Sequence, residues 1–283
     1  MEPNRQMWRK SRQDNALTLV GASATFRTDR PPAARSLRVT SPDGEPPDYA
    51  QPTLHYQDLL LFVPVLLFSV IAHEYAHGYA ALKQGDTTAL MLGRLTWNPV
   101  KHIDPFMTVL LPAMLYFASG GKMMLGGAKP VPVNPRNYRN FKRGDIIVSL
   151  AGVFVNFLLA LLAVVLFVLV GLLGRAVPGA SSTLGIVQAM MLIAVQLNLL
   201  LLAFNLIPIP PLDGSHVMKY LLPPAWSLRY QQFGRYGIVI LILLLYMGGG
   251  IFNTWMRPVL ALQDVLFRWV DPFSLATLRQ WLS

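Results

Sequence analysis

The run LLLFVPVLLFSVIA (residues 59–72) is followed directly by HEYAH (residues 73–77). The first run has no charged residue and is typical of a helix that crosses a membrane. The second places two imidazoles and a carboxylate in the continuation of that helix. Because ionisable side chains are costly at membrane depth, they mark functional sites there. The stretch therefore predicts a membrane helix that carries a polar site.

The polar residues form an H-E-x-x-H pattern, which indicates a metal site. On a helix, positions i and i+4 share one face, so His73 and His77 can bind one metal ion. Glu74 lies between them and can act as general base toward water at the metal. The alternative is a helix with two ordinary histidines, because so short a pattern recurs by chance. The setting favours the metal, since two of the five histidines of the chain fall in register inside an apolar helix.

The composition predicts an all-α polytopic membrane protein. Of the 283 residues, 53% are hydrophobic and 13% are charged, and the mean hydropathy is +0.43. About a quarter of the residues are charged in a soluble domain. We expect about four to six transmembrane helices, with a short re-entrant or hairpin element between the first and second full spans.

The charge and cysteine content exclude several kinds of site. The net charge of +10 fits cytoplasmic loops that meet anionic lipid. No nucleic-acid partner is expected, because no Gly-rich phosphate loop or RNA-binding aromatic pattern accompanies the basic residues. The chain has no cysteine, which excludes disulfides and thiolate zinc ligands.

The chain divides into three predicted regions. Residues 1–50 are polar and have no apolar run of the kind found in a signal peptide, so we expect a disordered tail. Residues 51–256 form the predicted membrane core. Residues 257–283 are amphipathic and are expected to lie at the membrane interface.

The core contains four predicted spans and one shorter apolar segment. The shorter segment, 105–121, contains two prolines, and its usable helix of about 15 residues reaches only ~22 Å across a ~30 Å hydrocarbon layer. It is therefore expected to be re-entrant or peripheral. The predicted spans are 57–82, 146–174, 185–207 and 236–256.

A third metal ligand is expected, because catalytic zinc usually has three protein ligands and one open position. Asp213 follows the apolar run 185–207 and a break that contains three prolines. Prolines free backbone groups, which need a protected setting at membrane depth. This favours Asp213 as the ligand. Two alternatives remain: Asp213 as the N-cap of a helix that begins near Ser215, and His216 as the ligand.

Four motifs together resemble one known family. The H-E-x-x-H with NLIPIPPLDG (residues 205–214) resembles the site-2 protease group of intramembrane zinc metalloproteases, peptidase family M50. GGAKPVPVNPR (residues 126–136) is similar to the Gly-Gly/Pro-Val-Asn loop of that group. SLAG (residues 149–152) with Asn156 is similar to its S-x-A-G-P-x-x-N helix, except that Val153 stands where proline is usual, which puts a local helix kink in doubt. The resemblance covers roughly residues 57–255.

The resemblance implies an activity and a set of catalytic residues. The chain would be a zinc metalloprotease with one Zn²⁺, and it would hydrolyse peptide bonds in transmembrane segments of membrane-protein substrates. The zinc ligands would be His73, His77 and Asp213, and Glu74 would be the general base. Asn205 would help to hold the scissile carbonyl or its oxyanion.

Three further residues are implied to bind substrate. Gly126 and Gly127 would form an exposed strand edge that receives an unwound substrate by β-addition, although a tight turn is the alternative. Asn156 would contact the site, or it would bond across helices in a structural role.

The ligand positions also predict a topology. The histidines and Asp213 lie toward the C-terminal ends of their helices, so those helices should run parallel. One crossing between them is then needed, and residues 146–174 supply it. Loops on the active-site side contain twelve Lys and Arg residues, against five on the other side. The positive-inside rule therefore predicts a multi-pass protein of the cell membrane with its active site nearer the cytoplasm, although this places the basic tail of residues 1–50 outside.

Two other functions fit some of the pattern. A metal-binding membrane transporter would also contain broken helices, but it predicts an internal repeat, which we do not find. A non-proteolytic binder of membrane proteins would lack Glu74 or one of the ligands. Transmembrane substrates and the lipid bilayer are the expected partners, and the sequence does not define an oligomeric state.

Overall fold

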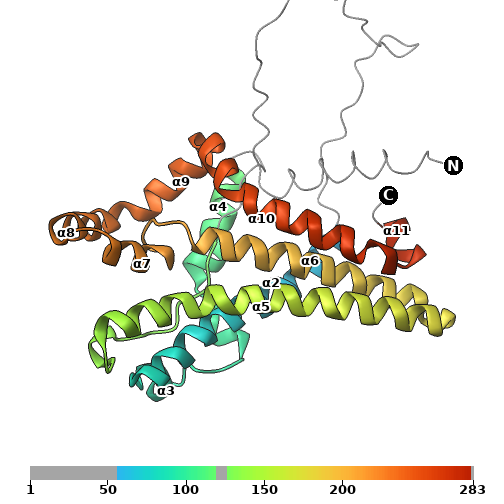
Figure 1. Cartoon of the computed structure of the whole chain (residues 1–283), viewed down its shortest axis with the longest axis horizontal. Helices are drawn as coiled ribbons and strands as arrows, with labels where there is room; N and C mark the ends of the chain where they lie inside the picture. The colour runs from blue at the N-terminus through green and yellow to red at the C-terminus, as the bar shows by residue number, and fades with distance from the viewer. Residues whose placement is uncertain (1–55, 119–125, 282–283) are drawn as a thin grey trace, which may run out of the picture. The chain divides into compact units, whose positions relative to one another are not determined.

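The computed structural model describes residues 56–118 and 126–281, and every regular element among them is helical (Figure 1). The prediction of an all-α protein is confirmed. The predicted tail, 1–50, lies outside the described residues. The helices are α2 (Tyr56–Gln84), α3 (Thr88–Met91), α4 (Leu111–Ala118), α5 (Phe141–Ala176), α6 (Ser181–Asn205), α7 (Gly214–Leu221), α8 (Pro224–Phe233), α9 (Gly237–Met247), α10 (Gly249–Val270) and α11 (Ala276–Trp281). Short 3₁₀ turns connect several of them, and a π-helical turn (Pro105–Leu110) leads into α4.

Three described helical segments are long and apolar enough to cross a membrane: Leu60–Gln84, Phe141–Ala176 and Pro178–Asn205. A fourth crossing is present if the bent pair Pro224–Met247 and Gly249–Phe273 counts as one span. The polytopic character of the chain is therefore confirmed. The described part of the segment 105–121, which contains the π-helical turn and α4, is not among these spans, and residues 119–121 lie outside the described residues.

The predicted span 236–256 is not one straight helix. The two halves of the pair meet at Gly248 with a bend of 89°. Three consecutive glycines, 248–250, occupy this place. Glycine costs a helix interior about 1 kcal/mol relative to alanine, so three in a row explain why the helix breaks here.

Helices α5 and α6 form an antiparallel hairpin closed by the 3₁₀ turn Pro178–Ala180. Figure 1 shows them side by side, with α10 along α6. Alanines on α5 allow the close approach, because small residues bring membrane helices together. Their core contains Ala160, Ala163, Val195 and Leu199.

The contacts between helices define their directions. Along α2, Ser69 hydrogen-bonds Asn198 of α6 at 2.9 Å, and His73, one turn later, lies near Asp213, which follows α6. Positions therefore advance together along α2 and α6. On α5 the order is reversed, because Val148 contacts His77 and the later Asn156 contacts His73. These contacts agree with the expected parallel arrangement of α2 and α6.

The end of α2 is fixed by a glycine turn and a buried carboxylate. Gly85 has φ +109°, and the N–H groups of Gly85 and Asp86 bond back to the last turn of the helix. The fully buried Asp86 accepts hydrogen bonds from Thr88, from the Asn134 N–H at 2.6 Å and from Asn137 at 2.8 Å. Burial alone would raise the pKa of Asp86, but these hydrogen bonds together hold it below its ordinary value. Asp86 thereby fastens the segment before α5 to the end of α2.

Candidate metal centre

Three side chains from two regions of the chain meet at one point. The Nε2 atoms of His73 and His77 lie 3.0 Å apart, and Oδ2 of Asp213 lies 3.2 Å from the first and 3.4 Å from the second. All three atoms fall within 4.8 Å of one another. Bonds of ~2.0–2.1 Å at tetrahedral angles place ligand atoms about 3.3 Å apart. The spacing therefore fits a zinc ion held by two imidazoles and one carboxylate.

The backbone around Asp213 explains how its carboxylate reaches the histidines. Helix α6 ends at Asn205, and the Pro-rich segment that follows turns the chain before α7 begins at Gly214. Gly214 is required here, because a Cβ on it would lie 2.2 Å from the carbonyl oxygen of Leu206. Asp213 occupies the N-cap position of α7, but its side chain makes no capping hydrogen bond. The carboxylate faces the two histidines instead.

The alternative ligand, His216, lies elsewhere. Its Nδ1 is 3.2 Å from Oδ1 of Asp145. Within the described residues of the chain, the group that could hold a metal contains His73, His77 and Asp213. The geometry thus favours Asp213 over His216.

One face of α5 positions both histidines. Nδ1 of His77 lies 2.7 Å from the carbonyl oxygen of Val148 and can only donate to it, which leaves Nε2 free to bind a metal. Gly152 packs directly on the imidazoles: a Cβ there would lie 2.5 Å from Nε2 of His77 and 2.6 Å from Cε1 of His73. Helix α5 runs without interruption through Val153, the position at which the resemblance left a local kink in doubt. Asn156 completes this face.

Asn156 is fully buried, and its amide lies 3.1 Å from Nδ1 of His73. As placed, Nδ2 faces the imidazole, and Oδ1 has no hydrogen-bond partner among the described residues. A metal on Nε2 of His73 requires the proton on Nδ1, which then needs an acceptor. Rotating the Asn156 amide by half a turn exchanges Oδ1 and Nδ2, two atoms that are told apart by their hydrogen-bond partners. Oδ1 then accepts the proton of His73 Nδ1. The same half-turn gives the buried oxygen a partner.

Glu74 is held by the Pro-Val-Pro segment before α5. The Val131 N–H donates to Oε2 of Glu74 at 2.8 Å. Prolines flank Val131 on both sides and have no N–H, so this run offers a single donor. The segment is held by the Lys129 N–H, which donates to the carbonyl of His102 at 2.8 Å.

The remaining predicted site residues lie farther from these contacts. Gly126 and Gly127 are exposed in a stretch without helix, and Thr108 donates to the carbonyl of Gly127 at 2.7 Å. No strand occurs in residues 126–134, so a strand edge for substrate stays a prediction. The amide of Asn205 donates to Leu201 in its own helix at 2.9 Å. Its oxyanion role also stays a prediction.

Sequence reasoning missed the contacts between Asp145 and the residues of α7. Asp145 directly precedes the apolar run 146–174, a position that fits the membrane interface, but it is 2% exposed. The available signal was its position: it lies three residues before Val148 and seven before Gly152, on the face of α5 that contacts the histidines.

Comparisons with known proteins define the family of this chain. A family profile described as Peptidase family M50 matches residues 61–182 and 169–247, so this chain belongs to that family. "Putative zinc metalloprotease YwhC" of Bacillus subtilis (strain 168) is 39% identical over 193 residues, which cover 68% of this chain and 83% of that protein. "Putative zinc metalloprotease Rip2" of Mycolicibacterium smegmatis is 31% identical over 198 residues, which cover 70% of this chain and 71% of that protein. No solved structure matches the chain significantly.

Family membership confirms the predicted class of enzyme. The chain is a multi-pass membrane protein and a zinc metalloprotease of the site-2 type. Zinc is its cofactor, and the group of His73, His77 and Asp213 offers a site for it. The names of the relatives do not support the transporter or the non-proteolytic binder.

Proposed function

We propose that this chain cleaves peptide bonds within transmembrane segments of membrane proteins. In this proposal His73, His77 and Asp213 are the zinc ligands, and Glu74 is the general base. The observation that carries it is the convergence of three ligand atoms within 4.8 Å, two of them on a helix long and apolar enough to span a membrane. A site at this depth meets substrates that are themselves in the bilayer.

The residues around the ligands suit hydrolysis. When bound, zinc lowers the pKa of coordinated water to about 7 and polarises a carbonyl oxygen. Glu74 lies in the same helical turn as the proposed ligand His73, and in this proposal its carboxylate takes a proton from the attacking water and passes it to the leaving amine. The Val131 N–H occupies Oε2 and leaves Oε1 for that proton. Asn205 would stabilise the oxyanion after its amide turns away from Leu201.

The segment 126–134 supports a substrate-binding role for the glycines. A helical substrate has its peptide groups bonded internally, so it must unwind before cleavage. Gly126 and Gly127 are exposed, and the same segment reaches Glu74 through Val131. An unwound substrate that lies along this segment would therefore meet the general base. Asn156, which is fully buried against His73, would act on substrate through that ligand.

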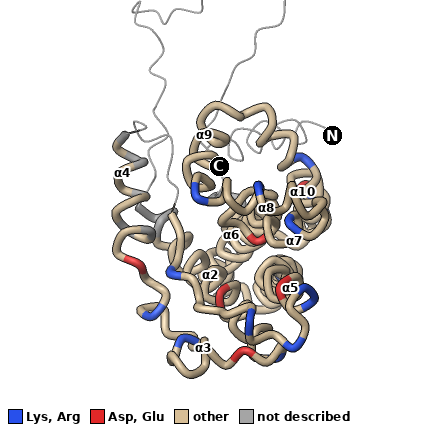
Figure 2. The backbone as a smooth tube through the Cα atoms, turned by 90° about the vertical axis from the view of Figure 1, so that its left-hand side faces the viewer, with Lys and Arg blue, Asp and Glu red and all other residues tan. Residues whose placement is uncertain are grey.

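The basic residues support a cytoplasmic position for the active site in the cell membrane. Figure 2 looks onto the end of the helices where α3, the start of α5, α7 and α8 lie, and it shows Lys and Arg in several of these elements. The loops 83–145 and 208–235 together contain twelve Lys and Arg residues. Such an excess marks the cytoplasmic side.

Cleavage of a membrane-inserted reporter tests the function. Glu74→Gln keeps the side-chain volume, and it should bind zinc as the wild type does while cleavage falls by about 10²–10⁴-fold. Mass spectrometry of the products should place the new termini inside the transmembrane segment of the reporter. Full activity of the zinc-loaded variant would disprove the role of Glu74, and termini outside that segment would disprove intramembrane cleavage.

A further inference from the structure

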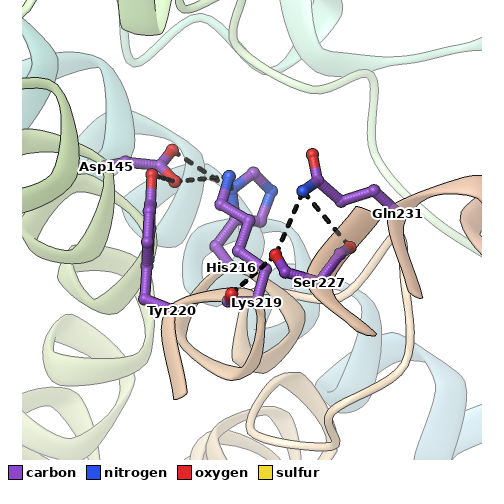
Figure 3. Close-up of polar contacts among 6 residues, drawn as sticks. All are labelled: Asp145, His216, Lys219, Tyr220, Ser227 and Gln231. Atoms are coloured by element: carbon purple, nitrogen blue, oxygen red, sulfur yellow. Dashed lines mark hydrogen bonds and ion pairs between the residues drawn. The ribbon is translucent and has the colours of Figure 1, made fainter. Parts of the chain in front are cut away.

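A second polar cluster, centred on the buried Asp145, joins α5 to α7 beside the proposed ligands. The carboxylate of Asp145 lies 2.6 Å from Nζ of Lys219 and 3.2 Å from Nδ1 of His216. Tyr220 donates its hydroxyl hydrogen to the same carboxylate at 2.9 Å. Figure 3 shows these three side chains of α7 converging on Asp145. One carboxylate of α5 thus contacts three side chains of α7.

The spacing of these partners fixes the orientation of α7. Positions 216, 219 and 220 are i, i+3 and i+4, so they lie on one face of the helix. Asp213 directly precedes the first residue of α7, and its carboxylate makes no capping bond that would hold it in place. The segment between α6 and α7 is not a regular helix. Contacts made by α7 therefore help to determine where the Asp213 carboxylate lies.

The same face of α5 contacts the other two ligands. Positions 145, 148, 152 and 156 are separated by three or four residues and line one side of α5. Val148 binds His77 through its carbonyl, and Asn156 contacts His73. Residues 145–156 of α5 span about 16 Å at 1.5 Å per residue. This stretch contacts the two histidines directly, and it contacts Asp213 indirectly, through α7.

The geometry points to Asp145 as a positioning residue for the metal centre: it holds α7 against α5 and so keeps Asp213 within bonding distance of a metal bound to His73 and His77. This role rests on the proposed ligand assignment. Asparagine at 145 removes the charge that pairs with Lys219 and leaves that ammonium without its buried partner. α7 is then free to shift, and Asp213 shifts with it.

A double-mutant cycle separates this role from a general effect on folding. Zinc affinity is measured by chelator competition on the full-length protein in lipid nanodiscs, for the wild type, Asp145→Asn, Asp213→Ala and the double variant. Asp145→Asn should weaken zinc binding by about 10–100-fold, as loss of an outer partner of a metal ligand does. In the Asp213→Ala background the same change should have no effect beyond about twofold, because nothing remains for Asp145 to position.

Two further variants keep the test decisive. Tyr220→Phe removes one hydrogen bond to Asp145 and keeps the ring, so it should weaken zinc binding by roughly fivefold even if Asp145→Asn fails to fold. Gln188→Leu is the control: it removes a buried amide of α6 that donates to the carbonyl oxygens of Phe167 and Phe273, outside the ligand cluster. It should lower the melting temperature and leave zinc affinity unchanged.

The outcomes distinguish this inference from the proposed ligand set. Unchanged affinity in both Asp145→Asn and Tyr220→Phe, or an equal loss with and without Asp213, overturns the positioning role. If Asp213→Ala itself binds zinc as tightly as the wild type, the ligand assignment fails instead.

Discussion

Gly152→Ala tests how closely α5 must approach His73 and His77, the proposed metal ligands. The added Cβ would lie 2.5 Å from Nε2 of His77 and 2.6 Å from Cε1 of His73. Nonbonded heavy atoms rest about 3.5–4.0 Å apart, so the two imidazoles or α5 must move by roughly 1 Å. Metal bonds tolerate about 0.2 Å. We therefore expect zinc affinity to fall by more than about 100-fold, comparable to the loss of a ligand.

The helix itself would favour this substitution. Alanine is better than glycine in a helix interior by about 1 kcal/mol, so reduced helix propensity cannot explain a loss of zinc. The assay is the zinc content of the purified full-length protein after dialysis, with affinity from chelator competition. Gly179→Ala is the matched control, because a Cβ at that position has no atom within 4 Å. Wild-type zinc content and affinity in Gly152→Ala would refute the packing argument.

Three further predictions concern Asn156, Asp86 and the membrane topology. Asn156→Leu should weaken zinc binding by about 10–100-fold, whereas Asn156→Asp should retain it, because a carboxylate still accepts the proton of His73 Nδ1. Chelator competition measures zinc affinity in both variants. Equal losses of affinity would contradict the proposed orientation of the Asn156 amide. The pKa of Asp86 is lower in the folded protein than its ordinary value of about 3.9, so its stabilising effect is fully present above that pH and is lost as the pH falls through the lower folded pKa. The melting temperature of the wild type should therefore fall more steeply below pH 4 than that of Asp86→Asn, and parallel melting curves would refute this. Because the chain has no native cysteine, a membrane-impermeant maleimide applied to whole cells should label the exposed Ser182→Cys and spare Gln232→Cys; the opposite labelling would place the active site outside.

The long spans were predictable because their signal is local. Residues 146–174 form an uncharged run, and the structure extends that helix only to Phe141–Ala176. The pair His73 and His77 was predictable for the same reason, since a spacing of four residues fixes their common face. Predicting Asp213 required the Pro-rich motif around it, because no local spacing relates Asp213 to the two histidines.

The features missed by sequence analysis depend on distant contacts. Asp145 and His216 are 71 positions apart, and the burial of Asp145 depends on how α7 packs. Without that packing, a carboxylate at the start of an apolar run fits the membrane interface equally well. The break at Gly248 was missed because the residues around it are apolar. That hydropathy predicted one continuous span over 236–256 despite the three glycines.

The contacts of α5 restrict how a substrate can enter. In the proposed function the substrate is a transmembrane segment, which would have to enter from the side, through an opening between a pair of helices. Moving α5 away from α2 would remove the carbonyl of Val148 and the amide of Asn156 from the histidines. Moving α5 away from α7 would separate Asp145 from the helix that follows Asp213. A substrate gate that preserves the metal centre must therefore keep α5 packed on α2 and on α7. It must open between other helices.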